Sequence, residues 1–360
     1  MDELAFLSAT ELAGKIRSRD ISCVELLQYY LDRVDRFNGA LNAIVFDMRE
    51  QALAEAAAAD VALARDESIG PLHGVPMTVK ESYKIAGTPA TWGNPAWADI
   101  LADEDAESIK KLKNAGAIIF GKTNVPLSLA DFQSYNDVYG TTNNPYDHSR
   151  IPGGSSGGSA AALAAGLTGL ETGSDIAGSI RNPAHFCGIF GHKPTHNLVW
   201  MRGHAAPGDI RSDSDISVIG PMARSAKDLD TAVRVMAGPG AIMSRGYHLN
   251  LPEWGQRQLS ELKVGVWGND PVAPVSQEVA GRVDNVIQAL RDASAHVDEA
   301  ARPNFTGQES HAIFQTLLHS TMAARQSDEN YQSLLKYVAT LEADDNSEKA
   351  TVFRAQVASF

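Results

Sequence analysis

The chain has 360 residues, of which 44% are hydrophobic and 21% are charged, as in a globular protein and unlike a disordered chain or a fibre. Acidic residues outnumber basic ones by 44 to 31, and the net charge of −13 argues against a broad nucleic-acid-binding surface. Cys23 and Cys187 lie far apart and match no metal-binding spacing, so we expect free thiols. No secretory signal is visible and no apolar run reaches ~18 residues, so we expect a cytoplasmic protein with no membrane partner.

The N-terminal part of the chain is predicted to be mostly helical. Two serines precede a glutamate by three positions, which is the spacing of a capping box at the start of a helix. The elements expected here are a helix after Ser8 and Glu11, a helix after Ser22 and Glu25, a strand over 43–46 and a helix over 49–65. We expect residues 1–65 to form a helical segment that packs on a core spanning residues 66–360.

Beyond residue 65, strand and helix signals alternate. This alternation favours an α/β fold with a mixed, mostly parallel central sheet covered by helices. The elements that carry it are strands over 75–79, 117–120 and 262–267, helices over 107–114, 160–165, 277–293, 309–326 and 331–341, a helix capped by Ser225, and a loop-like linker over 238–255. An apolar pattern then continues through Val352 and Val357 with no polar stop, so we expect a C-terminal part of the domain to lie beyond this chain.

Residues 116–123 match the P-loop pattern G-x-x-x-x-G-K-T. A phosphate-binding loop of this kind needs a flexible turn followed by a helix that begins at the lysine. The four central residues are apolar and typical of a strand, and Pro126 follows closely. We therefore interpret this segment as a strand and not as a nucleotide site.

Gly153 to Ser159 is the run of the chain that is richest in glycine and serine. It could be a flexible linker or an anion-binding nest of backbone amides. It also contains the pattern G-x-S-x-G around Ser155, which is typical of the nucleophile elbow of α/β-hydrolases. The run by itself leaves these alternatives open.

A second such stretch, from Gly173 to Arg181, places Ser179 after small residues that permit close backbone approach. Successive amides over 176–179 could converge on one developing oxyanion, although a glycine-rich turn is the alternative. Lys80 ends an apolar strand, where partial desolvation would lower the pKa of its amine and make it a base. A lysine at a strand end is more often simply solvated, but two serines in glycine-rich segments favour the base.

These three segments together resemble the amidase signature family. The similarity runs from about residue 8 to residue 237 and is densest over 71–82, 121–126 and 150–195. Ser155 and Ser179 lie 24 positions apart, as in the family pattern.

The resemblance implies a role for each of these residues. Lys80 would be the base, Ser155 a bridging serine held by a cis peptide, and Ser179 the nucleophile. The implied oxyanion hole consists of the backbone amides of Ile176, Ala177, Gly178 and Ser179, and the implied acyl pocket is lined by Leu129 and Ala130.

We therefore expect a hydrolase of linear amides that converts a carboxamide to a carboxylic acid and ammonia or an amine, through a serine acyl-enzyme and a Ser-Ser-Lys triad. No metal or organic cofactor is expected, and the partner is a small-molecule amide and no nucleic acid. A homodimer is an open option. The alternatives are the A subunit of a tRNA-dependent amidotransferase, which would need further subunits as partners, and a truncated homologue that is not catalytic.

Overall fold

The computed structural model describes residues 2–67, 69–207, 214–253, 255, 257–323, 326–345 and 347–358. The chain forms two compact units, residues 1–249 and 250–360. The boundary between them falls inside the segment predicted as a linker, 238–255. The helical segment expected over 1–65 lies within the first unit, and its boundary at residue 65 stays a prediction.

The first unit begins with helices whose starts follow directly from the sequence. Helix α1 (Ala9–Arg17) is capped by Ser8 and helix α2 (Cys23–Leu41) by Ser22, and both predicted capping boxes are present. In each box the serine hydroxyl accepts from the third backbone amide of the helix, which would otherwise lack a partner. The apolar face of α2 is buried against strand residues Ile118 and Phe120.

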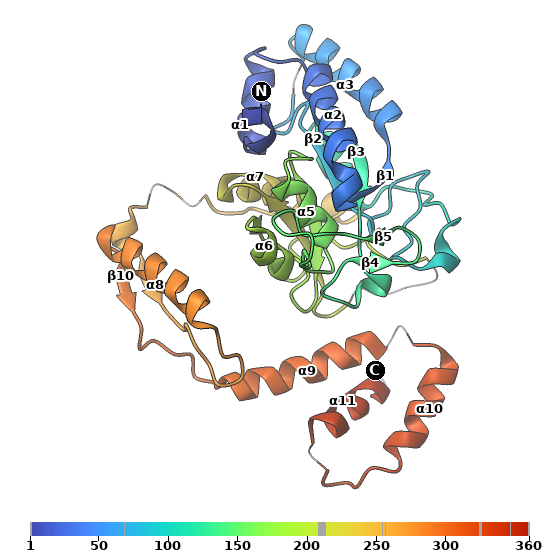
Figure 1. Cartoon of the computed structure of the whole chain (residues 1–360), viewed down its shortest axis with the longest axis vertical. Coiled ribbons are helices and arrows are strands. Elements are labelled where there is room, and N and C mark those ends of the chain that lie inside the picture. Colours follow the sequence, from blue (N-terminus) through green and yellow to red (C-terminus); the bar gives the residue numbers. More distant parts are fainter. Residues whose placement is uncertain are drawn as a thin grey trace. The chain divides into compact units, whose positions relative to one another are not determined.

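These helices cover a three-stranded sheet. Its order is β1 (Ile44–Asp47), β3 (Ile118–Thr123) and β2 (Pro76–Lys80), in which β2 is parallel to β3 and β1 is antiparallel. Helix α2 and helix α3 (Arg49–Ala64) lie side by side against this sheet (Figure 1). Every residue of β2 and β3 is buried, including Lys80 at the end of β2.

A second sheet carries the other glycine- and serine-rich segment. Its order is β6 (Glu171–Asp175), β8 (Val218–Ala223) and β7 (Phe190–Gly191), with antiparallel pairing throughout. Helix α5 (Gly157–Ala164) packs beside β6, and α6 (Arg181–Cys187) follows the turn after β6. Strand β6 was not predicted, because its sequence, Glu-Thr-Gly-Ser-Asp, is polar although all five residues are buried.

The α/β class with a mixed sheet covered by helices is confirmed. The emphasis on parallel pairing is wrong for the described residues, where four of the six strand pairings are antiparallel. The reason is that β8 pairs antiparallel with both β6 and β7, and the spacing of apolar segments does not encode strand direction. The other α-helices and strands of this unit, among the described residues, are α4 (Glu107–Asn114), β4 (Tyr135–Asn136), β5 (Gly140–Thr141) and α7 (Ala226–Met236).

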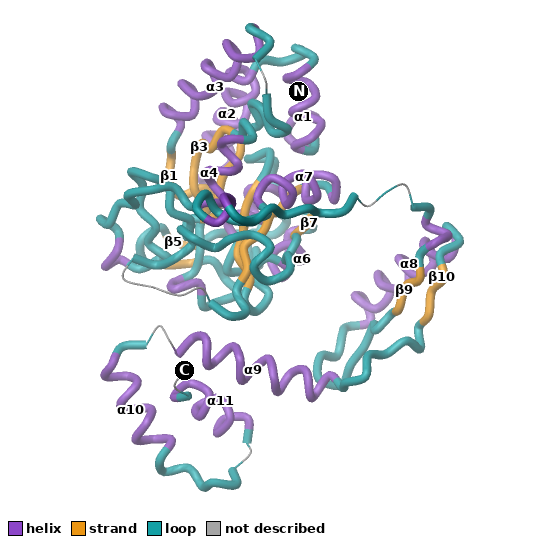
Figure 2. Tube along the Cα trace, turned by 180° about the vertical axis from the view of Figure 1, so that it is seen from behind, coloured by secondary structure: helices purple, strands orange, loops and turns teal. Residues whose placement is uncertain are grey.

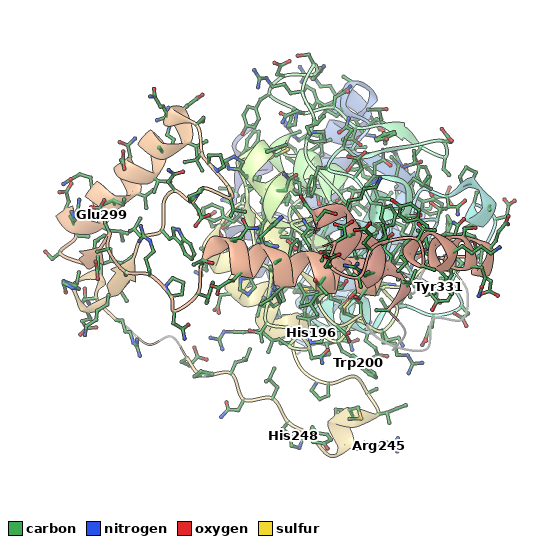
Figure 3. The ribbon with its side chains drawn as sticks, turned by 90° about the horizontal axis from the view of Figure 1, so that it is seen from below. His196, Trp200, Arg245, His248, Glu299 and Tyr331 are labelled. Carbon is green, nitrogen blue, oxygen red and sulfur yellow. The ribbon has the colours of Figure 1, made fainter. Side chains whose placement is uncertain are left out.

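Residues near the end of the first unit are hydrogen-bonded to the segment before β8. The amide of Gly238 donates to the carbonyl of Leu198 at 2.8 Å, and Val199 forms a β-bridge with Gly238. The indole ring of Trp200 (Figure 3) occupies the space that a side chain at position 240 would need, so only glycine fits there.

The second unit is described by itself. It contains a parallel pair of short strands, four α-helices and a 3-10 helix (Leu259–Glu261) within the described residues (Figure 2). Its elements are β9 (Lys263–Gly265), α8 (Gln277–Asp292), β10 (His296–Asp298), α9 (Gly307–Ala323), α10 (Asp328–Val338) and α11 (Glu348–Val357). Among the residues described in both units, no helix combines the length and the apolar character needed to cross a bilayer.

Candidate active site

Lys80 lies at the centre of a cluster of serine hydroxyls. Its side chain is completely buried at the end of β2. The amine nitrogen Nζ is 2.7 Å from Oγ of Ser155, 3.0 Å from Oγ of Ser156 and 2.9 Å from Oγ of Ser174. The first contact joins two residues that the sequence singled out, whereas Ser156 and Ser174 were missed. The signal for both was present, because Ser156 follows Ser155 directly and Ser174 lies in the second glycine-rich segment.

The surroundings of Lys80 favour an uncharged amine. Burial lowers the pKa of Lys80 to about 7, while Asp175, Glu171 and Glu81 act in the opposite direction through their negative charges. The three serine hydroxyls satisfy the hydrogen-bonding groups of the amine whether or not it is protonated. The cluster therefore holds a group that can accept a proton near neutral pH.

The lowered pKa of Lys80 predicts a stability effect that can be measured. Between about pH 7 and 10.5 the unfolded chain binds the lysine proton and the folded chain does not, so stability should rise with pH over this window. Replacing Lys80 with Met removes this dependence. We expect the difference in the free energy of unfolding, Lys80→Met minus parent, to be greatest near pH 6. This difference should fall by on the order of 4 kcal/mol by pH 10.5. Urea unfolding at several pH values measures this, and a pH-independent difference would contradict it.

The run from Gly153 to Ser159 is a packed segment and not a flexible linker. The Gly154–Ser155 peptide bond is cis, as the family resemblance implied. A side chain at Gly154 would collide with the carbonyl oxygen of Asp131, so the run can approach this neighbour only because it lacks a Cβ there. Helix α5 begins inside the run, at Gly157, and not at residue 160 as predicted. The run therefore places Ser155 and Ser156 rigidly beside Lys80.

Ser179 lies on the turn that follows β6. It is only 5% exposed, and its carbonyl accepts from the amide of Ser156 at 3.2 Å, which joins the two glycine-rich segments. Among the described residues, no hydrogen bond joins the hydroxyl of Ser179 to Ser155. The structure thus brings Lys80 and Ser155 into direct contact and holds Ser179 beside them through the backbone.

Asp175 shapes this turn. Its buried carboxylate accepts from the amides of Gly178 at 2.8 Å and Ile180 at 3.1 Å, and from two nitrogens of the Arg181 guanidinium at 2.9 and 3.0 Å. Burial by itself raises the pKa of Asp175, but the hydrogen bonds and charge of Arg181 outweigh burial and lower it. Asp175 is therefore an ionised brace that fixes the path of the chain before Ser179.

The turn also modifies the predicted oxyanion hole. Because the amide of Gly178 already donates to Asp175, it is occupied in this structure. Within the described part of the chain, no acceptor pairs with the amides of Ala177 and Ser179. The amide of Ile176 likewise has no acceptor among the described residues, so three of the four predicted amides are left as donors for a ligand.

Replacing Asp175 with Asn should destabilise the protein by about 2–4 kcal/mol near pH 7, because several buried donors lose a charged acceptor. The pKa of Asp175 is lowered in the folded state, so its contribution is present above the unfolded value and lost as the pH falls through the folded one. The difference between the two proteins should therefore shrink in acid. Asp147→Asn, at an exposed carboxylate, is the control and should change stability by less than about 0.5 kcal/mol. Equal effects of both substitutions would contradict the bracing role.

Leu129 and Ala130, the predicted acyl-pocket residues, lie on an exposed segment that begins with a short 3-10 helix, Leu127–Leu129. Leu129 is half-buried and has a φ of 59°, in the left-handed region that is unusual for leucine. A Cβ added at Gly178 would come within van der Waals contact of the Phe132 ring. The segment therefore passes beside the turn that carries Ser179, and the pocket role of its residues stays a prediction.

A second buried lysine provides a useful contrast. Lys122 lies in β3, at the position that the P-loop pattern would give to a phosphate-binding lysine, and it is fully buried. Its amine donates to the carbonyl of Pro89 and to the hydroxyl of Thr88. Burial lowers the pKa of Lys122 to about 8. The partners of Lys122 are a backbone carbonyl and a threonine hydroxyl, unlike the serine hydroxyls around Lys80. The interpretation of this segment as a strand is confirmed, since β3 covers Ile118–Thr123.

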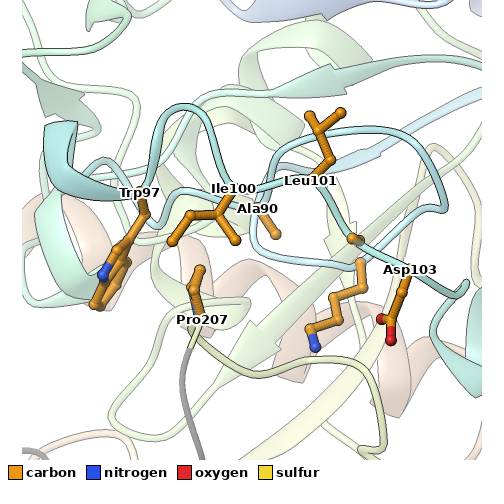
Figure 4. Close-up of a pocket in the computed structure, with 8 residues that line it drawn as sticks. Ala90, Trp97, Ile100, Leu101, Asp103 and Pro207 are labelled. Carbon is orange, nitrogen blue, oxygen red and sulfur yellow. The ribbon is translucent and has the colours of Figure 1, made fainter.

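A cavity of about 420 Å³ opens elsewhere in the first unit (Figure 4). It is mostly apolar, with Lys84 and Asp103 as its charged residues. Neither Lys80 nor any of the serines around it lines this cavity. The serine cluster is therefore identified by its hydrogen bonds and not by the size of a pocket.

The fold and the cluster together define an α/β protein with a buried serine–lysine site, and comparisons with known proteins agree. The family model described as Amidase matches residues 25–358. The chain is 43% identical over 246 residues to fatty-acid amide hydrolase 2-A of Danio rerio, covering 66% of this chain and 46% of that protein. It is 34% identical over 328 residues to the A subunit of the glutamyl-tRNA(Gln) amidotransferase of Gloeobacter violaceus, covering 90% of this chain and 66% of that protein.

Solved structures give the same result. Peptide amidase from Stenotrophomonas maltophilia superimposes with a TM-score of 0.76 at 25% identity, covering 98% of this chain and 75% of that chain. The chain belongs to the amidase signature family. It spans 46% and 66% of the length of the two curated relatives named above.

Proposed function

We propose that the protein is an amidase that hydrolyses a carboxamide through an acyl-enzyme on Ser179. The observation that carries this proposal is the contact of 2.7 Å between Nζ of Lys80 and Oγ of Ser155, in a fully buried site beside the turn of Ser179. A neutral Lys80 takes a proton from Ser155, and Ser155 takes one from Ser179. Catalytic hydrogen bonds are often long in empty sites, so we expect the contact between Ser155 and Ser179 to close when substrate binds.

The activated oxygen of Ser179 then attacks the amide carbonyl. The resulting oxyanion accepts from the amides of Ala177 and Ser179, and removing one donor of this kind typically costs about 3–4 kcal/mol of transition-state stabilisation. The proton returns through Ser155 to the leaving nitrogen as the carbon–nitrogen bond breaks. Water, deprotonated by the same relay, hydrolyses the ester of Ser179 and releases the acid.

The two other serines of the cluster support this assignment. Oγ of Ser156 and Oγ of Ser174 accept from Nζ of Lys80, as Oγ of Ser155 does. In the proposed relay, Ser155 is the serine that gives its proton to the lone pair of a neutral Lys80. Ser156 is itself held by the amide of Ser174 at 3.4 Å. The two serines thus hold the amine of Lys80 in place beside Ser155.

The test is hydrolysis of simple aliphatic and aryl amides by the purified chain, together with mass-spectrometric mapping of a fluorophosphonate label. We expect turnover and a label on Ser179. A folded protein with neither turnover nor label would contradict the proposal and would favour a homologue that is not catalytic.

A second candidate is the A subunit of a tRNA-dependent amidotransferase. It is favoured by the similarity to the amidotransferase chain of Gloeobacter violaceus, which covers 90% of this chain. The same triad would then release ammonia from glutamine. Glutaminase activity that appears only after the other subunits are added would support this candidate against a free-standing amidase.

A further inference from the structure

Strands β2 and β6 belong to different sheets but run alongside each other. Among the described pairings, β2 pairs with β3 and β6 with β8. Separate contacts at successive levels join β2 to β6 and to the residues just before β6. The amide of Gly169 donates to the carbonyl of Pro76 at 3.0 Å, and the amide of Thr78 donates to the hydroxyl of Thr168 at 2.9 Å.

The next contact along the strands involves a buried carboxyl group. The hydroxyl of Thr78 donates to Oε1 of Glu171 at 2.6 Å, and the amide of Thr172 donates to Oε2 at 2.9 Å. Glu171 is 0% exposed. Thr78 and Lys80 are two positions apart and therefore share one face of β2. The contact of Glu171 thus lies immediately before the level at which Lys80 meets Ser174.

The charge of Glu171 also acts on Lys80. A carboxylate at this position favours the ammonium form of Lys80, as do Glu81 and Asp175. Tyr83 is the further titratable group that Glu171 affects, and burial raises the pKa of its phenol. Burial raises the pKa of Glu171 to about 7, against the hydrogen bonds from Thr78 and Thr172. Burial therefore favours the uncharged form of Glu171, as it does that of Lys80.

We propose that Glu171 is a positioning residue of the active site: its carboxyl group holds the strand that carries Lys80 against the strand that carries Ser174, and its charge sets how readily Lys80 releases a proton. The proposal rests on the role of Lys80 as base. It assigns to Glu171 no contact with the substrate.

Two substitutions separate the two parts of the proposal. Glu171→Gln keeps the shape and the acceptor for Thr78 but removes the charge. We expect it to lower the titration midpoint of Lys80 by about 1 pH unit, and to shift the acid limb of kcat/KM for an aryl amide equally. Thr78→Val removes the hydrogen bond and leaves the carboxyl group in place, and we expect a fall in kcat of about 10-fold or more with KM little changed.

Asp228→Asn is the matched control. Asp228 is a buried carboxylate that also joins two elements, since it accepts from the amides of Ala9 and Thr10 at the start of α1. This substitution should destabilise the fold and leave the Lys80 midpoint unchanged. The midpoint is read from the ε-carbon resonance of ¹³C-labelled lysine, assigned with Lys80→Met.

An unchanged Lys80 midpoint in Glu171→Gln would overturn the proposal, even in an active amidase. If the parent protein hydrolyses no amide, the proposed function fails, while the resonance still tests Glu171 directly. Should Glu171→Gln fail to fold, the reverse measurement decides. Lys80→Met must raise the midpoint of the Glu171 carboxyl carbon, because two interacting groups affect each other's proton affinity by equal amounts. No change there would overturn the proposal.

Discussion

Replacing Ser179 with Ala should lower kcat/KM for an amide substrate by at least about 10³-fold, because no other hydroxyl of the described residues stands on the turn with free amides for an oxyanion. The structure should be little affected, since the hydroxyl of Ser179 makes no hydrogen bond to another described residue. Circular dichroism and urea unfolding should therefore match those of the parent. The fluorophosphonate label should also disappear.

Ser149→Ala is the control for this substitution. Ser149 is an exposed serine near the glycine- and serine-rich run, and its hydroxyl bonds only to Asp147 within the described residues. It should keep full turnover and full labelling. Turnover retained by Ser179→Ala would remove Ser179 from the nucleophile role and would leave the fold and the family unaffected.

Replacing Lys80 with Met should lower kcat/KM near pH 7 by about 10²–10⁴-fold, the range that general-base catalysis supplies. Methionine fills a similar volume but cannot accept a proton. In the parent, activity should rise through about pH 7 as Lys80 loses its proton. In Lys80→Met this step should be absent, and the residual activity should rise only at higher pH, where hydroxide can act as the base.

Lys122→Met is a closely matched control, since it also removes a buried lysine whose pKa is lowered. It should reduce stability, because the carbonyl of Pro89 loses its donor. The acid limb of the activity profile should stay where it is in the parent. If both lysine substitutions moved that limb alike, the assignment of the base to Lys80 would be wrong.

Much of this fold follows from short-range signals. The capping boxes at Ser8 and Ser22 determine where two helices begin, and apolar runs mark β2 and β3 because those strands are covered on both faces. Strand β6 carries no such signal, since its buried side chains are polar and their partners come from distant segments. Glu171 is an example, because its partner Thr78 is 93 positions away.

The candidate site was predictable only in part. Spacing and resemblance identified Lys80, Ser155 and Ser179, and the structure places the first two in contact. Resemblance could not show that Asp175 takes the amide of Gly178, because that depends on how the turn is closed. Nor could it show that Lys80 has three serine partners, since Ser174 is 94 positions from Lys80 and their contact depends on how two strands lie in the fold.

The most direct test is the rate at which a fluorophosphonate reacts with the parent protein. The rate is measured as a function of pH, and the labelled residue is mapped at each pH. We predict modification of the serine at position 179, at a rate that climbs as the pH passes through about 7, where the neighbouring amine becomes neutral. A label on another residue, or a rate that rises only near the ordinary pKa of lysine, about 10.4, would contradict this account.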